Sequence, residues 1–217
     1  MLKALLCDLD DTVYAPETGL WPAIGARITD YIVLRFGLTE FEARALRSAY
    51  YEKYGLTLLG LMEAHHIDPD DYLAFVHDLP LSEYIRPDPA LGAMLGRLPL
   101  RKAIFTNADA AHADRVLVEL GIRQHFTDII DIAATRFHPK PQTGAYETAL
   151  DRLGVQPDEC IFADDLVSNL AAAHALGITT VWVRPNVEGP LPDGIDYQIA
   201  HLKGLERVVA ERMAPMG

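Results

Sequence analysis

Cysteine is scarce in this chain, which has only two among 217 residues. Cys7 and Cys160 each lie within an apolar, strand-like run, so we interpret them as small buried core residues rather than as a disulfide or a pair of metal ligands. A chain of this length can bury roughly 70% of its unfolded surface, so its fold requires neither a disulfide nor a structural metal.

Positive charge is also in short supply. The chain has 19 Lys and Arg against 31 Asp and Glu, which gives a net charge of −12. This balance argues against a nucleic-acid polymer or an anionic membrane as a partner, because both are negatively charged. An anionic substrate would need a local reversal of sign, supplied by a metal ion or by a well-placed Lys or Arg.

Long apolar runs and targeting signals are absent from the sequence. No run approaches the ~20 apolar residues that span a bilayer. The N-terminal stretch lacks the basic-then-apolar pattern of a signal peptide, because its first apolar run reaches Asp8 almost at once. We therefore expect a cytoplasmic protein with no membrane partner. For its oligomeric state we expect a monomer or a homodimer.

Strands and helices alternate over the C-terminal part of the chain. Apolar, strand-like runs follow one another at 4–7, 102–105, 129–133, 160–163, 179–183 and 197–200. Helical patterns separate or follow them at 90–98, 110–120, 142–153, 169–176 and 202–213. This alternation is typical of a parallel sheet with helices on both faces. The predicted fold class is therefore α/β, with a Rossmann-like core.

A helical block interrupts this pattern after the first strand. Four helices are expected, near 21–36, 39–54, 56–66 and 68–76. Thr39 and Glu42 have the spacing of a capping box, and Asp68-Pro69 combines an N-cap residue with proline at the first helical position. We predict a small helical cap of residues 16–86 inserted into an α/β core of residues 1–15 and 87–217.

Polar side chains follow the expected strands where ligands bind in open α/β sheets, at the carboxyl ends. In chain order they are Asp8 and Asp10, Thr106 and Asn107, Lys140, and Asp164 and Asp165 with Asn169. The acids suit a hard cation such as Mg²⁺, and the hydroxyl and ammonium suit an anion. Taken singly, each also has an ordinary interpretation: a solvated turn, a strand-end turn, a surface lysine or a helix cap.

Taken together, these groups match metal-assisted phosphoryl transfer. A metal ion and a lysine neutralise phosphate oxygens, so that a carboxylate can attack phosphorus despite its like charge. The attack gives an aspartyl-phosphate and divides one difficult step into two. A second carboxyl group protonates the leaving alkoxide and then takes a proton from the attacking water.

The motifs resemble those of the haloacid dehalogenase (HAD) superfamily phosphatases. In order they are Asp8-Leu9-Asp10-Asp11-Thr12, Phe105-Thr106-Asn107, Lys140-Pro141, and Asp164-Asp165 with Asn169. The resemblance extends from Lys3 to Pro185. It implies Asp8 as nucleophile, Asp10 as general acid and base, and Thr106 and Lys140 on the phosphate. It also implies Mg²⁺ held by the Asp8 carboxylate, the Asp10 backbone carbonyl and Asp165, with Asp164 as a further ligand or a partner of the ligands and Asn169 as an orienting group.

The segment 48–61 is similar to pyrimidine 5′-nucleotidases of the yeast and plant type, as are Leu79-Pro80-Leu81 and Arg86-Pro87-Asp88. This similarity implies hydrolysis of a nucleoside 5′-monophosphate such as UMP or CMP. It also implies substrate contacts from Tyr51, Lys53 and Tyr54, to which we add Asn107. A core role for the aromatic residues of this run is an equal alternative.

Other functions share this scaffold. A phosphatase for another small metabolite and a phosphomutase use the same groups. A 2-haloacid dehalogenase shares the nucleophile but needs no metal, and the acids Asp10, Asp164 and Asp165 argue against it because they would repel one another without a cation. A non-catalytic binding protein is the remaining alternative, and no lost motif residue supports it.

Overall fold

The computed structural model describes residues 1–185 and 189–214. Contacts divide the chain into an α/β unit, Met1–Pro16 with Ile85–Gly217, and a helical unit, Glu17–Tyr84. The boundaries expected from the sequence, 1–15 with 87–217 and 16–86, are close to these. That the helical unit acts as a cap stays a prediction.

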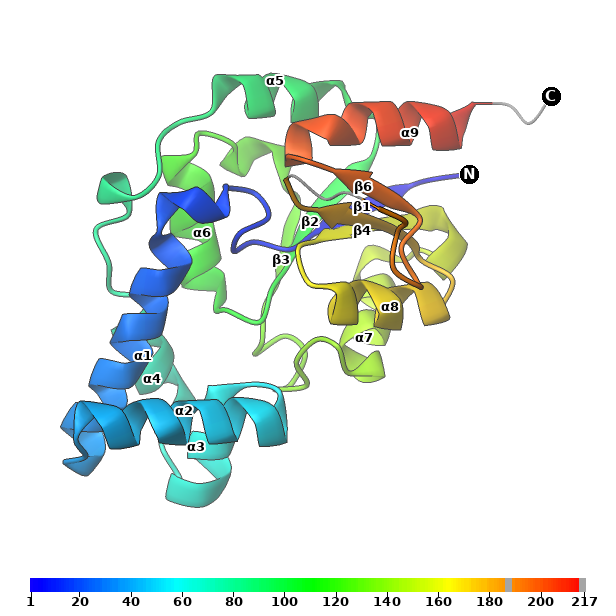
Figure 1. Ribbon diagram of the computed structural model, residues 1–217. Helices are drawn as coiled ribbons and strands as arrows, with labels where there is room; N and C mark the ends of the chain where they lie inside the picture. The colour runs from blue at the N-terminus through cyan, green and yellow to red at the C-terminus, as the bar shows by residue number, and fades with distance from the viewer. Residues whose placement is uncertain (186–188, 215–217) are drawn as a thin grey trace. The chain divides into compact units, whose positions relative to one another are not determined.

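One parallel sheet forms the centre of the α/β unit (Figure 1). In the described part of the chain its strands are β1 (Ala4–Cys7), β2 (Arg101–Phe105), β3 (Asp128–Ile130), β4 (Cys160–Asp164), β5 (Thr179–Val183) and β6 (Tyr197–Ile199). Their order is β3-β2-β1-β4-β5-β6, and every neighbouring pair is parallel. The predicted Rossmann-like α/β fold is confirmed.

Register brings the carboxyl ends of three strands together. Cys7, the last residue of β1, pairs with Ile104 of β2 and with Ala163 of β4. The chain continues in line for one more residue, because the backbone N–H of Asp8 donates to the carbonyl of Ala163 at 2.8 Å. Asp8 therefore leaves the sheet between the ends of β2 and β4, where the sequence predicts the other polar groups.

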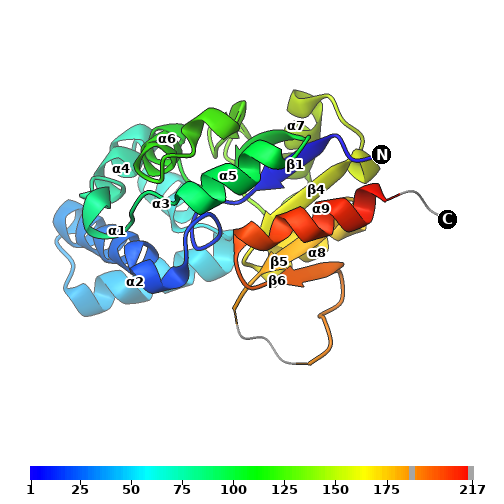
Figure 2. The same ribbon diagram turned by 90° about the horizontal axis from the view of Figure 1, so that it is seen from above.

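Helices cover both faces of the sheet. The described helices of this unit are α5 (Pro89–Arg97), α6 (Ala110–Glu119), α7 (Thr143–Leu153), α8 (Val167–Ala175) and α9 (Leu205–Met213). α5 and α9 lie over one face, and α7 and α8 over the other (Figures 1 and 2). Below the strand ends, the rings of Phe105, Phe162 and Tyr146 pack together with centroids 5.3–5.9 Å apart. This buried aromatic cluster packs beneath Lys140, whose Nζ lies 5.2 Å and 5.3 Å from the ring centroids of Phe105 and Phe162.

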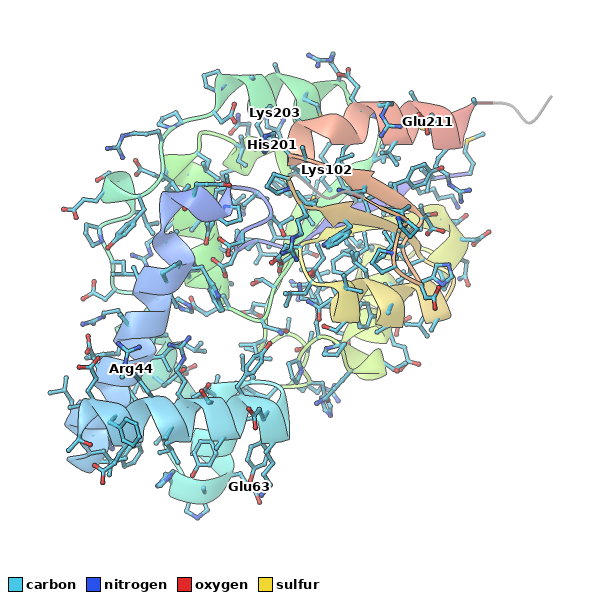
Figure 3. The ribbon with its side chains drawn as sticks, in the orientation of Figure 1. Arg44, Glu63, Lys102, His201, Lys203 and Glu211 are labelled. Atoms are coloured by element: carbon cyan, nitrogen blue, oxygen red, sulfur yellow. The ribbon has the colours of Figure 1, made fainter. Side chains whose placement is uncertain are left out.

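Several lysines and arginines of this unit make ion pairs or hydrogen bonds that stabilise the fold. Two ion pairs join the segment of α5 to that of α9: Arg97 Nε to Glu206 Oε1 at 2.6 Å, and Lys203 Nζ to Asp88 Oδ2 at 3.0 Å. Lys102 is buried, and its ammonium donates to the carbonyls of Leu98 and Leu100, each at 2.8 Å (Figure 3). Lys102 is the second residue of β2, so its charge does not lie at the carboxyl end.

The helical unit contains α1 (Leu20–Phe36), α2 (Glu40–Tyr54), α3 (Thr57–His65) and α4 (Pro69–Val76), which confirms the four expected helices. The predicted capping box forms before α2: Thr39 Oγ1 accepts from the backbone N–H of Glu42, and the Glu42 carboxylate accepts from that of Thr39. Gly37 and Gly55 end α1 and α2 with φ of 67° and 77°, a conformation that favours glycine.

Some element boundaries differ from expectation. The run 129–133 is not one strand, because β3 ends at Ile130 and the Asp131 carboxylate then accepts from the N–H groups of Ala110 and Ala134. The helix expected from 169 begins at Val167, where Asp164 Oδ1 accepts from Leu166 N and starts the turn early. No helix in the described residues is long and apolar enough to cross a membrane.

Gly60 of α3 offers a test of packing in the helical unit. A Cβ at this position would lie 2.4 Å from Cγ of Tyr50, too close for the ring to adjust by rotation. We expect Gly60→Ala to lower the free energy of unfolding by about 1–3 kcal/mol, the usual cost of overpacking. Urea denaturation measures this. Gly144→Ala in α7, where nothing lies within 4 Å, is the matched control and should be neutral or slightly stabilising. Equal changes in the free energy of unfolding for the two substitutions would contradict the close packing of Gly60 against Tyr50.

Candidate active site

A buried ammonium joins the ends of three strands. Lys140 Nζ donates to Asp8 Oδ1 at 2.6 Å, to Asp164 Oδ2 at 2.8 Å and to the carbonyl of Phe105 at 2.9 Å. Each acceptor lies at or just after the end of a strand: β1, β4 and β2. Three predicted site residues, far apart in the sequence, are therefore in direct contact.

Asn107 holds the lysine in place. Its Oδ1 accepts from the backbone N–H of Lys140 at 2.8 Å, and its Nδ2 donates to the Lys140 carbonyl at 3.2 Å. The structure shows both ends of the Asn107 amide bonded to the Lys140 backbone, so Asn107 positions the lysine. The substrate contact expected from Asn107 stays a prediction. The sequence gives no signal for this pairing, because the two residues are far apart in the chain.

Three carboxylates form a candidate metal site. Asp8, Asp164 and Asp165 each offer an oxygen within 4.8 Å of the others. Asn169 Nδ2 donates to both oxygens of Asp164, each at 3.1 Å. Trp182 Nε1 donates to the carbonyl of Asp165 at 2.8 Å and fixes the turn that carries it. Three carboxylates held by neighbouring groups fit a hard cation such as Mg²⁺, which prefers oxygen ligands.

The electrostatics of this cluster favour a cation. Burial raises the pKa of Asp8 well above its ordinary value, and Lys140 only partly opposes this. Burial, reinforced by Asp164 and Asp11, raises the pKa of Asp165 from 3.8 to about 7. Burial also lowers the pKa of Lys140, but the carboxylates of Asp164 and Asp8 outweigh it and hold that pKa above its usual range. One ammonium is thus not enough for three neighbouring carboxylates.

Two further predicted residues lie beside this cluster. Thr106 is buried directly after β2, and its Oγ1 accepts from the backbone N–H of Ala108 at 3.0 Å. Asp10 lies in the loop after β1, and its carboxylate is outside the three-carboxylate group. The acid–base role expected of the Asp10 side chain stays a prediction. The expected metal contact of its backbone carbonyl stays a prediction.

The structure adds residues that sequence reasoning missed. Thr12 Oγ1 donates to Asp8 Oδ2 at 3.1 Å, and Tyr14 donates to Asp10 Oδ1 at 2.5 Å. His112 Nε2 lies 3.4 Å from the same oxygen of Asp10. Thr12 and Tyr14 follow their partners by four residues, so a turn after β1 could have suggested them. His112 comes from α6, and no local pattern indicates its contact.

The aromatic run lies on α2 of the helical unit. Tyr51 is 53% exposed, and Lys53 Nζ lies 4.8 Å from the ring centroid of Tyr54. Tyr50 packs against Tyr54 edge to face, with centroids 5.9 Å apart. Part of the run is thus structural. The substrate contacts expected from Tyr51, Lys53 and Tyr54 stay predictions.

Residues 2–177 match the family described as haloacid dehalogenase-like hydrolase. Phosphate metabolism protein 8 of Saccharomyces cerevisiae is 30% identical over 191 residues, 81% of this chain and 60% of that protein. Fructose-1-phosphate phosphatase YqaB of Escherichia coli is 30% identical over 109 residues, 50% of this chain and 53% of that protein. Phosphoglycolate phosphatase of Rhodospirillum rubrum is 26% identical over 198 residues, 83% of this chain and 79% of that protein. The chain thus spans less than two thirds of the first two relatives.

Solved structures share the fold. A HAD phosphatase from Thermococcus onnurineus has a TM-score of 0.63 and 22% identity, covering 96% of this chain and 98% of that chain. L-2-haloacid dehalogenase from Xanthobacter autotrophicus has a TM-score of 0.65 and 18% identity, covering 99% of this chain and all of that chain. At these identities the similarity shows the fold alone. A phosphatase and a dehalogenase both have it, so the site residues must distinguish the two chemistries.

The raised pKa of Asp165 predicts how stability depends on pH. The folded protein keeps this proton up to about pH 7 while the unfolded chain loses it near 3.8. The free energy of unfolding of the metal-free protein should therefore fall as the pH rises from about 4 to about 7. Asp8 contributes in the same direction, so the comparison with Asp165→Asn isolates Asp165. Urea denaturation in EDTA measures both, and parallel pH profiles for the two proteins would contradict the assignment.

Proposed function

The chain belongs to the haloacid dehalogenase-like hydrolase family, and from this membership we propose that it hydrolyses small phosphomonoesters with Mg²⁺, through an aspartyl-phosphate on Asp8. The observation that carries the proposal is the contact of Lys140 with Asp8 and Asp164, beside Asp165. An ammonium and a cation site next to a nucleophilic carboxylate are what attack on a phosphate dianion requires.

The roles proposed for the chain's own groups are those that the motif resemblance implies, and their positions support them. Asp8 forms a bond to phosphorus while the ester oxygen leaves, and Lys140 offsets the negative charge that gathers there. Thr106, buried at the end of β2, is placed to donate its hydroxyl proton to a phosphate oxygen. Asp10 gives its proton to the leaving oxygen. Asp10 then takes a proton from the water that attacks phosphorus, which frees Asp8 and releases phosphate.

Asp8 and Asp165 would hold the metal ion, with Asp164 shared between the ion and Lys140. When bound, Mg²⁺ supplies a Lewis acid that neutralises phosphate oxygens. The raised pKa of Asp165 supports this assignment, because a divalent cation would offset the burial and the nearby carboxylates that keep its proton bound. A dehalogenase, which needs no metal, has no use for this third carboxylate.

For the substrate we propose a nucleoside 5′-monophosphate, with a pyrimidine nucleotide as the first candidate. Its support is the resemblance of segment 48–61 to pyrimidine 5′-nucleotidases. Relatives named for fructose 1-phosphate and phosphoglycolate support the wider class of small phosphomonoesters. Assays of phosphate release from a panel of nucleoside 5′-monophosphates and other small phosphomonoesters decide between the two substrate classes.

Replacing the nucleophile tests the core of the proposal. We expect Asp8→Asn to lower phosphate release by roughly 10⁴-fold or more, since the amide cannot form the covalent intermediate. Near-ultraviolet circular dichroism should show an intact fold. Asp30→Asn, an exposed carboxylate on α1, is the matched control and should keep full activity. Wild-type turnover by Asp8→Asn would show that another residue is the nucleophile.

Metal removal separates the reaction classes. EDTA should abolish phosphate release from the panel, and added Mg²⁺ should restore it, because the carboxylate cluster repels a phosphate dianion without a cation. Isothermal titration should show Mg²⁺ binding to the wild type and its loss in Asp165→Asn. Halide release from a 2-haloacid that persists in EDTA would favour the dehalogenase instead.

A further inference from the structure

Two side chains from different elements converge on one oxygen of Asp10. The Tyr14 hydroxyl donates to Oδ1 at 2.5 Å, and Nε2 of His112 lies 3.4 Å from the same atom. We propose that Tyr14 and His112 are positioning residues that fix the orientation of Asp10 for both proton transfers. This inference rests on the proposed function, in which Asp10 is the general acid and base.

Both residues are buried, so neither can easily turn away from Asp10. Tyr14 is 5% exposed and His112 is fully buried. A packed side chain holds its rotamer, whereas water at the same place would reorient with the carboxylate. Proton transfer requires the acid within hydrogen-bond distance of the reacting oxygen, so a fixed carboxylate is an advantage over a mobile one.

The position of His112 follows from how α6 begins. The Asp109 carboxylate accepts from the backbone N–H of His112 at 2.8 Å, which places the histidine in the first turn of the helix. α6 starts soon after Thr106, and β2 is the direct neighbour of β1. The strand end that presents Thr106 therefore also brings His112 to the loop that carries Asp10. The phosphate contact and the acid–base group are built from the same pair of strands.

A matched pair of esters separates positioning from mere structural support. The nucleoside leaves a nucleoside 5′-monophosphate as a strongly basic alkoxide that needs a proton from Asp10. The leaving group of p-nitrophenyl phosphate is a stable phenolate that does not need one. The ratio kcat/KM covers the steps up to formation of the aspartyl-phosphate, so it reports the transfer to the leaving group. We expect Tyr14→Phe to lower kcat/KM by about 10-fold or more for the nucleotide and by less than about 3-fold for the nitrophenyl ester, a part of the roughly 10²–10⁴-fold that general acid–base catalysis contributes.

The histidine gives a second and independent test. His112→Leu removes the ring nitrogen and should show the same preference for the nitrophenyl ester. His112→Gln keeps a donor near the position of Nε2 and should recover much of the loss on the nucleotide. In an Asp10→Asn background, Tyr14→Phe should cause little further loss, because residues that act through one group are not additive.

Tyr31→Phe is the matched control. It removes a hydrogen bond of the same chemical type, from the Tyr31 hydroxyl to Asp71 at 3.3 Å, within the helical unit. It should leave both kcat/KM values unchanged. Thermal melting of each variant shows whether the fold is intact.

The outcomes distinguish this inference from the proposed function. A wild-type protein that hydrolyses neither ester would contradict the proposed function itself. If the wild type is active and Tyr14→Phe and His112→Leu lower kcat/KM equally for the two esters, or for neither, the positioning role is overturned. The phosphatase proposal would then still stand. If Tyr14→Phe fails to fold, the contrast between His112→Leu and His112→Gln decides the question.

Discussion

One ammonium group determines how the ends of the sheet are organised. Lys140 Nζ has three acceptors, and they come from the ends of β1, β4 and β2. A buried ammonium without partners would cost several kcal/mol. The folded state is therefore stable only when the loop that carries Lys140 brings its ammonium to these three acceptors. The same requirement holds Asp8 in one place and orientation. The same hydrogen bonds of the buried lysine thus stabilise the core and fix the orientation of Asp8, the proposed nucleophile.

The segment that delivers Lys140 shows what this constraint demands of the backbone. Arg136 and Phe137 have φ of 54° and 60°, in the left-handed region that side chains other than glycine seldom adopt. Such residues cost of order 1–3 kcal/mol each and persist where the surroundings fix them. Here the two bonds between Asn107 and the Lys140 backbone lie at the end of the same loop. We read the unfavourable backbone as the consequence of placing a lysine between three strand ends.

Sequence reasoning succeeds where a feature depends on local pattern or on the general geometry of parallel sheets. Alternating apolar and helical segments predict the sheet, and its carboxyl ends predict that Asp8, Lys140 and Asp164 meet. It fails where a side chain pairs with a distant partner. The contact of His112 with Asp10 depends on how α6 leaves β2, and the end of β3 depends on Asp131 bonding Ala110, so neither follows from any short window. The bonds between Asn107 and the Lys140 backbone likewise join residues far apart in the chain, so no local pattern predicts them.

Charge gives a reason to keep Asp10, the proposed acid–base group, apart from the candidate metal ligands. Three carboxylates and one ammonium leave a formal charge of −2 at the centre of the site, which would repel a phosphate dianion. A divalent cation held by these carboxylates would bring this sum to zero and remove the repulsion of the proposed phosphate substrate. Asp10 must remain able to carry a proton, and a carboxylate that joined the cation would lose that ability. Asp10 is not one of the three clustered carboxylates and instead contacts Tyr14 and His112, so one short segment after β1 carries both the proposed nucleophile and a separate proposed acid.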